Sequence, residues 1–240
     1  MNYPDNPNEE RGESHLNKIK DRITIDDIFM DLKLPKEVQI LDVACGVGNI
    51  GKRLQSEGYI NIDGLDPVQG YLEVASSIYG KNYKEFIDDK IPTSIPDGFY
   101  DVVICGAGFF HGLIPFKGLI ELLRLVNGKG LVIWSIVLTR ESSVNKKEND
   151  DDHSEIVNKM VKDGHCKVLH RIQCEKLAFT DSGAAYLSGY TSSGVEALGI
   201  VYIVQKEVEQ WSETMSLRIH LTPSFIISCQ SEDEGLAFLR

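Results

Sequence analysis

An aspartate and three glycines within residues 38–51 are the residues whose types and spacing point most directly to chemistry. Asp42 lies near the end of an apolar segment typical of a buried strand, and Gly46, Gly48 and Gly51 follow it. Glycine lets the backbone turn sharply and lets a ligand approach more closely than a Cβ would permit. A helix that begins there would direct its free N–H groups at that ligand. The pattern predicts a nucleotide-cofactor loop, in which a Cβ at Gly51, one turn into the helix, should be tolerated better than one at Gly48.

Three motifs overlap on this loop. Residues 46–51 satisfy the dinucleotide fingerprint G-x-G-x-x-G, and Asp66 lies near the distance at which that motif places an acid. The residues through Lys52 also fit a phosphate-binding loop, but Arg53 stands where a Ser or Thr would ligate Mg²⁺. The third motif begins earlier, because residues 41–48 (LDVACGVG) resemble the LDVACGTG form of the first motif of class I S-adenosylmethionine (SAM) methyltransferases. The longer match favours SAM.

The charge of Asp42 separates these alternatives. In a dinucleotide domain this position is usually apolar, because no charge is wanted beside a pyrophosphate. The resemblance to class I methyltransferases implies that SAM is the cofactor and that the carboxylate of Asp42 orders the loop around its methionine part. It also implies that Ala44, Pro67 and Gly106 line the cofactor site together with the first two glycines of the loop.

Further acids follow two other expected strands. Asp66 ends the strand expected over residues 59–65, where a carboxylate can accept hydrogen bonds from both ribose hydroxyls of a nucleoside. Asp88 and Asp89 follow the strand expected over residues 83–87, and one of them should accept from the adenine amino group. Since ligands of parallel sheets bind at the carboxyl ends of the strands, these acids predict one site.

Strand and helix patterns alternate along the chain with short connections. Further strands are expected over residues 99–105 and 131–136, with a helix over 117–126 between them. Alternating apolar residues predict two more strands, over 166–174 and 197–204, which would form a reversed hairpin. The prediction is a doubly wound α/β fold: a mostly parallel sheet with a C-terminal antiparallel hairpin, the Rossmann-like methyltransferase fold.

The resemblance covers about residues 36–140, and the stretch 106–115 is most similar to the Williams-Beuren critical-region methyltransferase-like group. We expect a flexible N-terminal segment over residues 1–22, a SAM-dependent methyltransferase domain over 23–205, and a C-terminal extension of unassigned structure over 206–240. The first segment lacks the aromatic lead-in that members of that group use to close the cofactor pocket.

The overall charge bears on the partner. The 240 residues carry a net charge of −11, and no basic aromatic stripe offsets it. Because nucleic-acid affinity depends on Lys and Arg contacts to phosphate, we expect a small-molecule methyl acceptor and no nucleic-acid partner. No apolar stretch approaches the length of a membrane span, so we expect no membrane partner. The oligomeric state is left open.

The cysteines and histidines do not predict a metal site. An odd number of cysteines, five, with two of them inside expected strands, is typical of a reduced, cytoplasmic protein. The set His165, Cys166, His170 and Cys174 resembles zinc ligands, but Cys166 and His170 would stand roughly 13 Å apart along a strand, too far to share an ion.

The loop after the fourth expected strand is where acceptors meet the methyl group in this family. His111 is its only titratable side chain, and it could deprotonate an acceptor hydroxyl or amine, or be an exposed loop histidine without a role. We expect a methyltransferase that acts on a small molecule or, as a second choice, on a protein side chain. The alternatives are a SAM-binding protein without activity and an NAD(P)-dependent oxidoreductase.

Overall fold

The computed structural model describes residues 16–109, 113–137, 150–178 and 196–207. All described elements belong to one structural unit, residues 1–207. The helices are α1 (Ile25–Asp31), α2 (Asn49–Ser56), α3 (Gln69–Val74), α4 (Leu119–Leu125) and α5 (Asp150–Lys162), with short 3-10 turns at Ala75–Ser77 and Phe116–Gly118. The strands are β1 (Leu16–Ile23), β2 (Ile40–Val43), β3 (Ile62–Leu65), β4 (Asn82–Tyr83), β5 (Tyr100–Cys105), β6 (Val126–Val137), β7 (Cys166–Ala178) and β8 (Glu196–Lys206).

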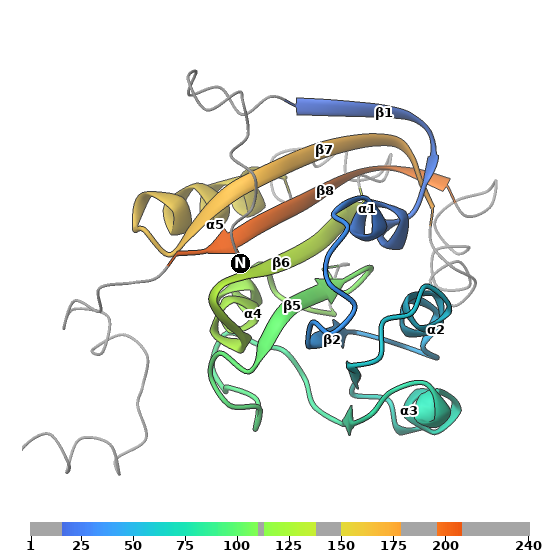
Figure 1. Cartoon of the computed structure of the whole chain (residues 1–240). Coiled ribbons are helices and arrows are strands. Elements are labelled where there is room, and N and C mark those ends of the chain that lie inside the picture. The colour runs from blue at the N-terminus through green and yellow to red at the C-terminus, as the bar shows by residue number, and fades with distance from the viewer. Residues whose placement is uncertain (1–15, 110–112, 138–149, 179–195, 208–240) are drawn as a thin grey trace, which may run out of the picture. The chain divides into compact units, whose positions relative to one another are not determined.

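The strands form one eight-stranded sheet in the order β1-β7-β8-β6-β5-β2-β3-β4 (Figure 1). Neighbours are parallel except at β8, which runs antiparallel to both β6 and β7. From β2 the chain moves outward to β3 and β4 and then returns to place β5 on the other side of β2. The predicted fold is confirmed, and the reversal beside β2 marks the edge where sheets of this class bind ligands.

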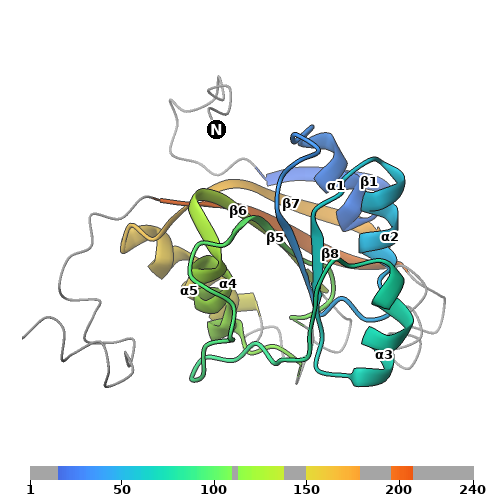
Figure 2. The ribbon, with the colours of Figure 1, turned by 60° about the horizontal axis from the view of Figure 1, so that its bottom comes forward.

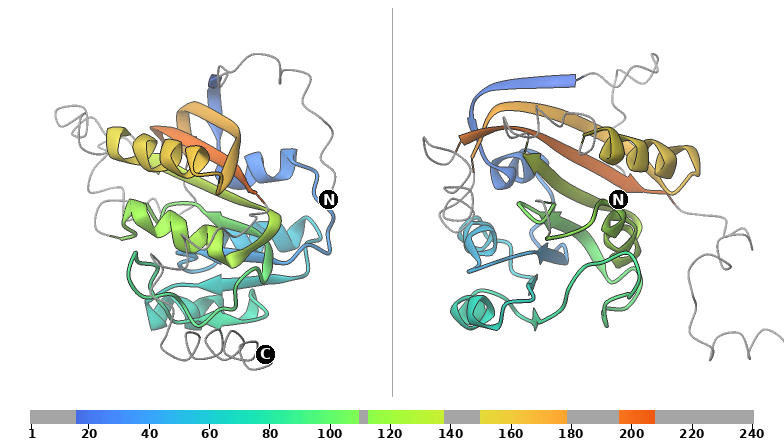
Figure 3. Two further views of the ribbon diagram at one scale, coloured as in Figure 1. Left: turned by 90° about the vertical axis from the view of Figure 1, so that its left-hand side faces the viewer. Right: turned by 180° about the vertical axis from the view of Figure 1, so that it is seen from behind.

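Helices cover both faces of the sheet: α1, α2 and α3 lie on one side, and α4 and α5 on the other (Figures 2 and 3). The alternation of side chains along β2 explains why both faces are apolar. Ile40 packs in the core with α1 to α3, whereas Leu41 and Val43 pack in the core with α4 and α5. Asp42 therefore lies on the α1 to α3 face, within an otherwise apolar layer.

The first helix, α1, has a capped N-terminus. Thr24 is its N-cap, and the Thr24 hydroxyl accepts from the amide of Asp27 at 3.2 Å. The Asp27 carboxylate accepts in return from the amide of Thr24 at 3.0 Å, which completes a capping box. The strand just before it was not predicted, because residues 1–22 were expected to be a flexible segment. In that segment β1 pairs in parallel with β7. The strand is therefore held by backbone hydrogen bonds to β7, which the composition of residues 1–22 does not reveal.

Several strand boundaries differ from the prediction, among them those of β4 and β6. β4 ends at Tyr83, whereas the sequence predicted a strand over 83–87. β6 begins at Val126, although the helix was expected to reach residue 126 and the strand to begin at residue 131. Tyr100 pairs with Val126 and Val102 with Leu131, so the glycine-containing stretch bulges within the ladder and does not end it. In the described ranges, no helix is long and apolar enough to cross a bilayer.

Candidate functional site

The loops that follow β2 and β3 are tied together at the carboxyl edge of the sheet. The amide of Cys45 donates to the carbonyl of Leu65 at 3.1 Å. The Asp66 carboxylate accepts from the amide of Gly46 at 3.0 Å through Oδ2 and from the amide of Val68 at 2.8 Å through Oδ1. Asp66 is only 6% exposed. It therefore links the glycine loop to the end of β3, and its oxygens keep lone pairs that can accept further hydrogen bonds.

The glycine loop has the left-handed backbone that its composition predicts. Gly46 and Gly48 have φ values of 55° and 88°, and Gly48 is the N-cap of α2 without a side-chain hydrogen bond. Ala44 also has a positive φ of 55°, although it carries a Cβ. Backbone strain of this kind persists only where the surrounding structure enforces it, and it clusters at ligand sites.

Asp42 is fully buried beneath this loop. Its Oδ2 atom accepts a hydrogen bond of 2.6 Å from the hydroxyl of Tyr79. Its Oδ1 atom, also buried, has no hydrogen-bond partner in the described part of the chain. Burial raises the pKa of Asp42 to about 7, although the hydrogen bond from Tyr79 acts to lower it. One carboxylate oxygen is thus left for a ligand or an ordered water.

Tyr79 is the residue of this region that sequence reasoning missed. Its ring lies where a Cβ on Gly51 or on Gly64 would stand: the distances would be 2.3 Å to Cε1 and 2.6 Å to Cδ2, respectively. The expected tolerance of a Cβ at Gly51 is thus not found, because Gly51 leaves room for a buried aromatic ring. Gly48 has no space for a side chain either: its Cβ would stand 2.6 Å from the Cδ1 atom of Ile78, on a backbone with a φ of 88°. The sequence offered one signal for Tyr79: glycines in two elements, at positions 51 and 64, and a tyrosine in a third segment, at position 79.

The two acids expected near the adenine ring are not equivalent. The Asp88 carboxylate accepts from the amides of Lys90 and Ile91 at 2.6 and 2.7 Å. These two backbone N–H groups, Ile91 first, hold the pKa of Asp88 below its usual value. Asp89 is exposed. Both lie several residues beyond the end of β4, on the loop that replaces the expected extension of this strand.

The loop after β5 packs against the glycine loop. A Cβ at Gly106 would stand 2.7 Å from the Cδ1 atom of Ile50, in the first turn of α2. The Gly106 carbonyl accepts a hydrogen bond from the hydroxyl of Ser135 on β6. Pro67 is partly exposed beside Asp66. His111, expected on this same loop, lies outside the described residues, so its role stays a prediction.

Where the loop after β5 leaves the sheet, it rests on an aromatic cluster made up of Phe109, Phe116, Trp134, His153 and Tyr202. The His153 ring on α5 lies 4.6 Å from the ring of Phe116 and 5.9 Å from that of Phe109, measured between centroids. Trp134 and Tyr202 stack at 5.0 Å on the adjacent strands β6 and β8. The two ends of the loop, residues 109 and 116, are thus both anchored on α5.

His153 is fully buried within this cluster. Its Nε2 atom accepts from the indole N–H of Trp134 at 2.8 Å, which assigns the ring proton to Nδ1. Burial, with a smaller effect from the charge of Arg171, lowers the pKa of His153 to about 3. His153 is therefore neutral at physiological pH.

The thiols near the site do not favour nucleophilic catalysis. Burial raises the pKa of Cys105 to about 12, and burial also raises the pKa of Cys45 above its ordinary value. On β7, Cys166 packs in the core on one face of the sheet and Cys174 in the core on the other. The residues that resembled zinc ligands are thus not brought together.

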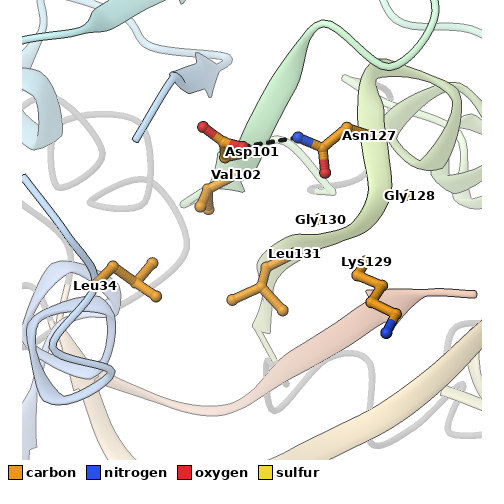
Figure 4. A pocket seen from close by; sticks show the side chains of 8 residues that line it. All are labelled: Leu34, Asp101, Val102, Asn127, Gly128, Lys129, Gly130 and Leu131. Carbon is orange, nitrogen blue, oxygen red and sulfur yellow. Dashed lines mark hydrogen bonds between the residues drawn. The ribbon is translucent and has the colours of Figure 1, made fainter. Parts of the chain in front are cut away.

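A cavity of about 290 Å³ lies at the opposite edge of the sheet (Figure 4). Leu34 and residues at the amino-terminal ends of β5 and β6 line it. Asn127 donates to Asp101 at 2.7 Å, and Asp101 accepts from the amide of Gln39 at 2.9 Å. These hydrogen bonds join strand ends, and ligands of such sheets bind at the other edge, so this cavity is not the candidate site.

Comparison with known proteins agrees with the geometry. Residues 40–130, from β2 into β6, match the family model of a methyltransferase domain. The structure resembles a SAM-dependent methyltransferase from Methanosarcina mazei with a TM-score of 0.54 and 17% identity, covering 75% of this chain and 98% of that one. Residues 40–130 thus match a methyltransferase domain, and the fold is that of SAM-dependent methyltransferases. This match implies SAM as the cofactor, and the dinucleotide and phosphate-loop alternatives are set aside.

Curated relatives share only part of their length with this chain. It is 29% identical to Methyltransferase-like protein 27 of Homo sapiens over 48% of this chain and 46% of that protein. It is 24% identical to tRNA U34 carboxymethyltransferase of Cellvibrio japonicus over 84% and 58%, respectively. It is 29% identical to ubiquinone biosynthesis O-methyltransferase of Rickettsia typhi over 51% and 50%. The chain spans about half the length of these relatives.

The buried imidazole predicts a loss of stability in acid. Below pH 6.5 the unfolded chain protonates His153, whereas the folded chain does not until about pH 3. The free energy of unfolding should therefore fall as the pH drops from 6.5 toward 4, with up to about 1.4 kcal/mol per pH unit coming from this residue. Urea denaturation at several pH values would measure it. A His153→Gln variant, which can still accept from Trp134, should lose this component; equal slopes in both proteins would contradict the buried neutral assignment.

Proposed function

We propose that this domain transfers the methyl group of SAM to a small-molecule acceptor that is neutral or cationic. The observation that carries the proposal is the arrangement at the carboxyl edge, where a strained glycine loop, a buried carboxylate with one unpartnered oxygen, and Asp66 come together. The narrower assignment to the Williams-Beuren group rests on residues 106–115 and is part of the same proposal.

The residues present fit SAM. Oδ1 of Asp42 is a buried acceptor without a partner in the described chain, suited to the cationic methionine part through a bound group or water. Ala44, Gly46 and Gly48 would border the same part of the cofactor, where their backbone turns. Asp66 has lone pairs beyond its two backbone hydrogen bonds and would accept from the ribose hydroxyls.

The remaining cofactor contacts follow the strand ends. Asp88 or Asp89 would accept from the adenine amino group, since the amides of its own turn engage only Oδ1 of Asp88 and Asp89 is exposed. Pro67 and Gly106 would border the nucleoside from the loops after β3 and β5. In this arrangement the charged methionine part of SAM would lie near β2, and its nucleoside would lie near β3 and β4.

SAM supplies an electrophilic methyl group, so the protein has to position and desolvate the acceptor. A base is needed only for an acceptor that is protonated at working pH. His111 is our candidate for that base, on the loop whose two ends rest on the aromatic cluster. The net charge of −11 supports a neutral or cationic acceptor over a polyanion. One curated relative acts in ubiquinone biosynthesis and another on tRNA, so both classes belong in the test.

Removing the charge of Asp66 should weaken SAM binding. Asp66→Asn keeps the size of the side chain but removes its charge and replaces the oxygen that accepts from Gly46 or the one that accepts from Val68, so the SAM dissociation constant should rise roughly ten- to a hundredfold. Calorimetry would measure it, with circular dichroism to verify folding. Asp163→Asn, the same change at an exposed residue just beyond the end of α5, is the matched control and should bind as the unaltered chain does. Unchanged affinity in a folded Asp66→Asn protein would refute the assigned role.

The acceptor class can be tested with SAM carrying a tritiated methyl group. We expect label to enter a small-molecule metabolite fraction, and not tRNA or total cellular protein offered separately. Labelling of tRNA that weakens steeply with salt, as phosphate contacts require, would overturn the electrostatic argument. Binding of SAM without any labelling would instead favour a SAM-binding protein without catalytic activity.

Once an acceptor is labelled, His111→Ala tests the base. If His111 removes a proton, the rate should fall about 10²–10⁴-fold, and the loss should shrink at high pH, where the acceptor loses its proton unaided. Phe116→Leu, which alters the anchor of the same loop, should not produce that pH dependence. A His111→Ala rate equal to that of the unaltered chain would make the histidine a bystander.

A further inference from the structure

Tyr79 is buried against the candidate site, and no motif gives it a role. Its side chain is 5% exposed, and its hydroxyl donates to the Oδ2 atom of Asp42 at 2.6 Å. Burial, and then the charge of Asp42, raise the pKa of Tyr79 far above its ordinary value, so it stays a proton donor at every working pH. The hydrogen bond therefore has one direction, from the phenol to the carboxylate.

Three glycines, Gly48, Gly51 and Gly64, form what we call the glycine socket around this ring. A Cβ would stand 2.3 Å from ring atom Cε1 at Gly51, 2.6 Å from Cδ2 at Gly64, and 3.3 Å from Cε2 at Gly48. Gly64 on β3 is the pairing partner of Asp42 on β2. A ring that covers Gly64 therefore brings its hydroxyl to the neighbouring carboxylate, while its other edge meets the first turns of α2.

We propose that Tyr79 is a positioning residue of the SAM site: its hydroxyl holds Asp42, and its ring holds the start of α2 against β3. The inference rests on the proposed function, because it takes Asp42 as part of the SAM site. The phenol occupies Oδ2 and leaves Oδ1 without a partner in the described chain, so it determines which oxygen faces the ligand side. The position of the Tyr79 ring also explains why residues 51 and 64 are glycines, which contact with the cofactor alone does not explain.

The surroundings of Asp42 explain why its hydroxyl partner matters. Asp26 on α1 and Asp66 after β3 act on it with like charge, and Cys45, whose thiol burial keeps protonated, lies in the adjoining loop. Tyr79 is the side chain that donates to Asp42 in the described chain. Without that donor, burial and the two acids would raise the pKa of Asp42 further, opposed only by the hydrogen bond from the backbone of Gly51 in the described chain.

Tyr79→Phe removes the hydroxyl and keeps the ring, so it tests the positioning role. We expect the SAM dissociation constant to rise about three- to tenfold at pH 7 relative to the unaltered chain, and this ratio to shrink toward pH 9. Taking the ratio cancels the titration of SAM itself. In an Asp42→Asn background the ratio should stay near one at every pH. Tyr59→Phe is the matched control, because Tyr59 is equally buried and donates only to the backbone carbonyl of Leu34 at 3.2 Å.

The socket is tested by melting temperature without any ligand. Gly51→Ala should lower the melting temperature in the normal chain, and it should raise or preserve it in a Tyr79→Leu background, where the clashing ring atoms are gone and alanine favours the helix. Gly70→Ala, in α3 with open space around it, should not lower it in either background.

The outcomes separate the two proposals. If the unaltered chain binds SAM and Tyr79→Phe binds it equally well at every pH, the positioning role of Tyr79 is overturned while the proposed function stands. If the unaltered chain binds no SAM, the proposed function fails and the positioning role fails with it. An equal loss of melting temperature from Gly51→Ala in both backgrounds would overturn the socket, whatever SAM does.

Discussion

A fully buried carboxylate in the central strand is the constraint on which the candidate site depends. Asp42 lies in an apolar layer beneath α1 to α3, where an unpaired charge would be costly. Tyr79 supplies a hydrogen bond, and the space for its ring comes from glycines on β3 and α2. The turn into α2, the glycines at its positions 48 and 51, and the orientation of the carboxylate are therefore parts of one packing arrangement.

Asp66 is a second buried carboxylate, and it joins the loops that follow β2 and β3. Parallel pairing of β2 with β3 brings the ends of both strands to the same edge, and one carboxylate then accepts from the backbone of each loop. If Asp66 also holds the ribose, as we propose, it couples cofactor affinity to the order of the glycine loop. Gly106 makes a comparable contact between elements: it lies close to Ile50, so the loop after β5 can lie against α2.

The two faces of the sheet contribute differently to the site. The α1 to α3 face carries Asp42 and Tyr79, which we propose for the cofactor side. The α4 and α5 face carries the aromatic cluster, on which both ends of the loop after β5 rest. His153 is neutral there because burial disfavours its charged form, and it serves as acceptor for Trp134. We regard it as a support for the loop expected to meet the acceptor, distinct from His111.

The run around Asp42 and the alternation of strand and helix patterns were enough to predict the fold, the cofactor class and the edge of the sheet where the acids meet. These are properties of neighbouring residues, since a strand, a glycine turn and a helix start are encoded within a few positions. The same reasoning missed β1, which depends on a backbone ladder with β7, and it misplaced the start of β6, where a bulge carries the glycines into the strand.

Local sequence also misjudged Gly51, because the ring that needs its space comes from Tyr79, 28 positions further along the chain. Residue types and short spacings thus determined which chemistry this chain carries and on which scaffold. Only the tertiary structure decided which carboxylate oxygens are engaged and which glycine makes room for a side chain. The physical reason is that burial and steric exclusion act between elements distant in sequence, and no local pattern records them.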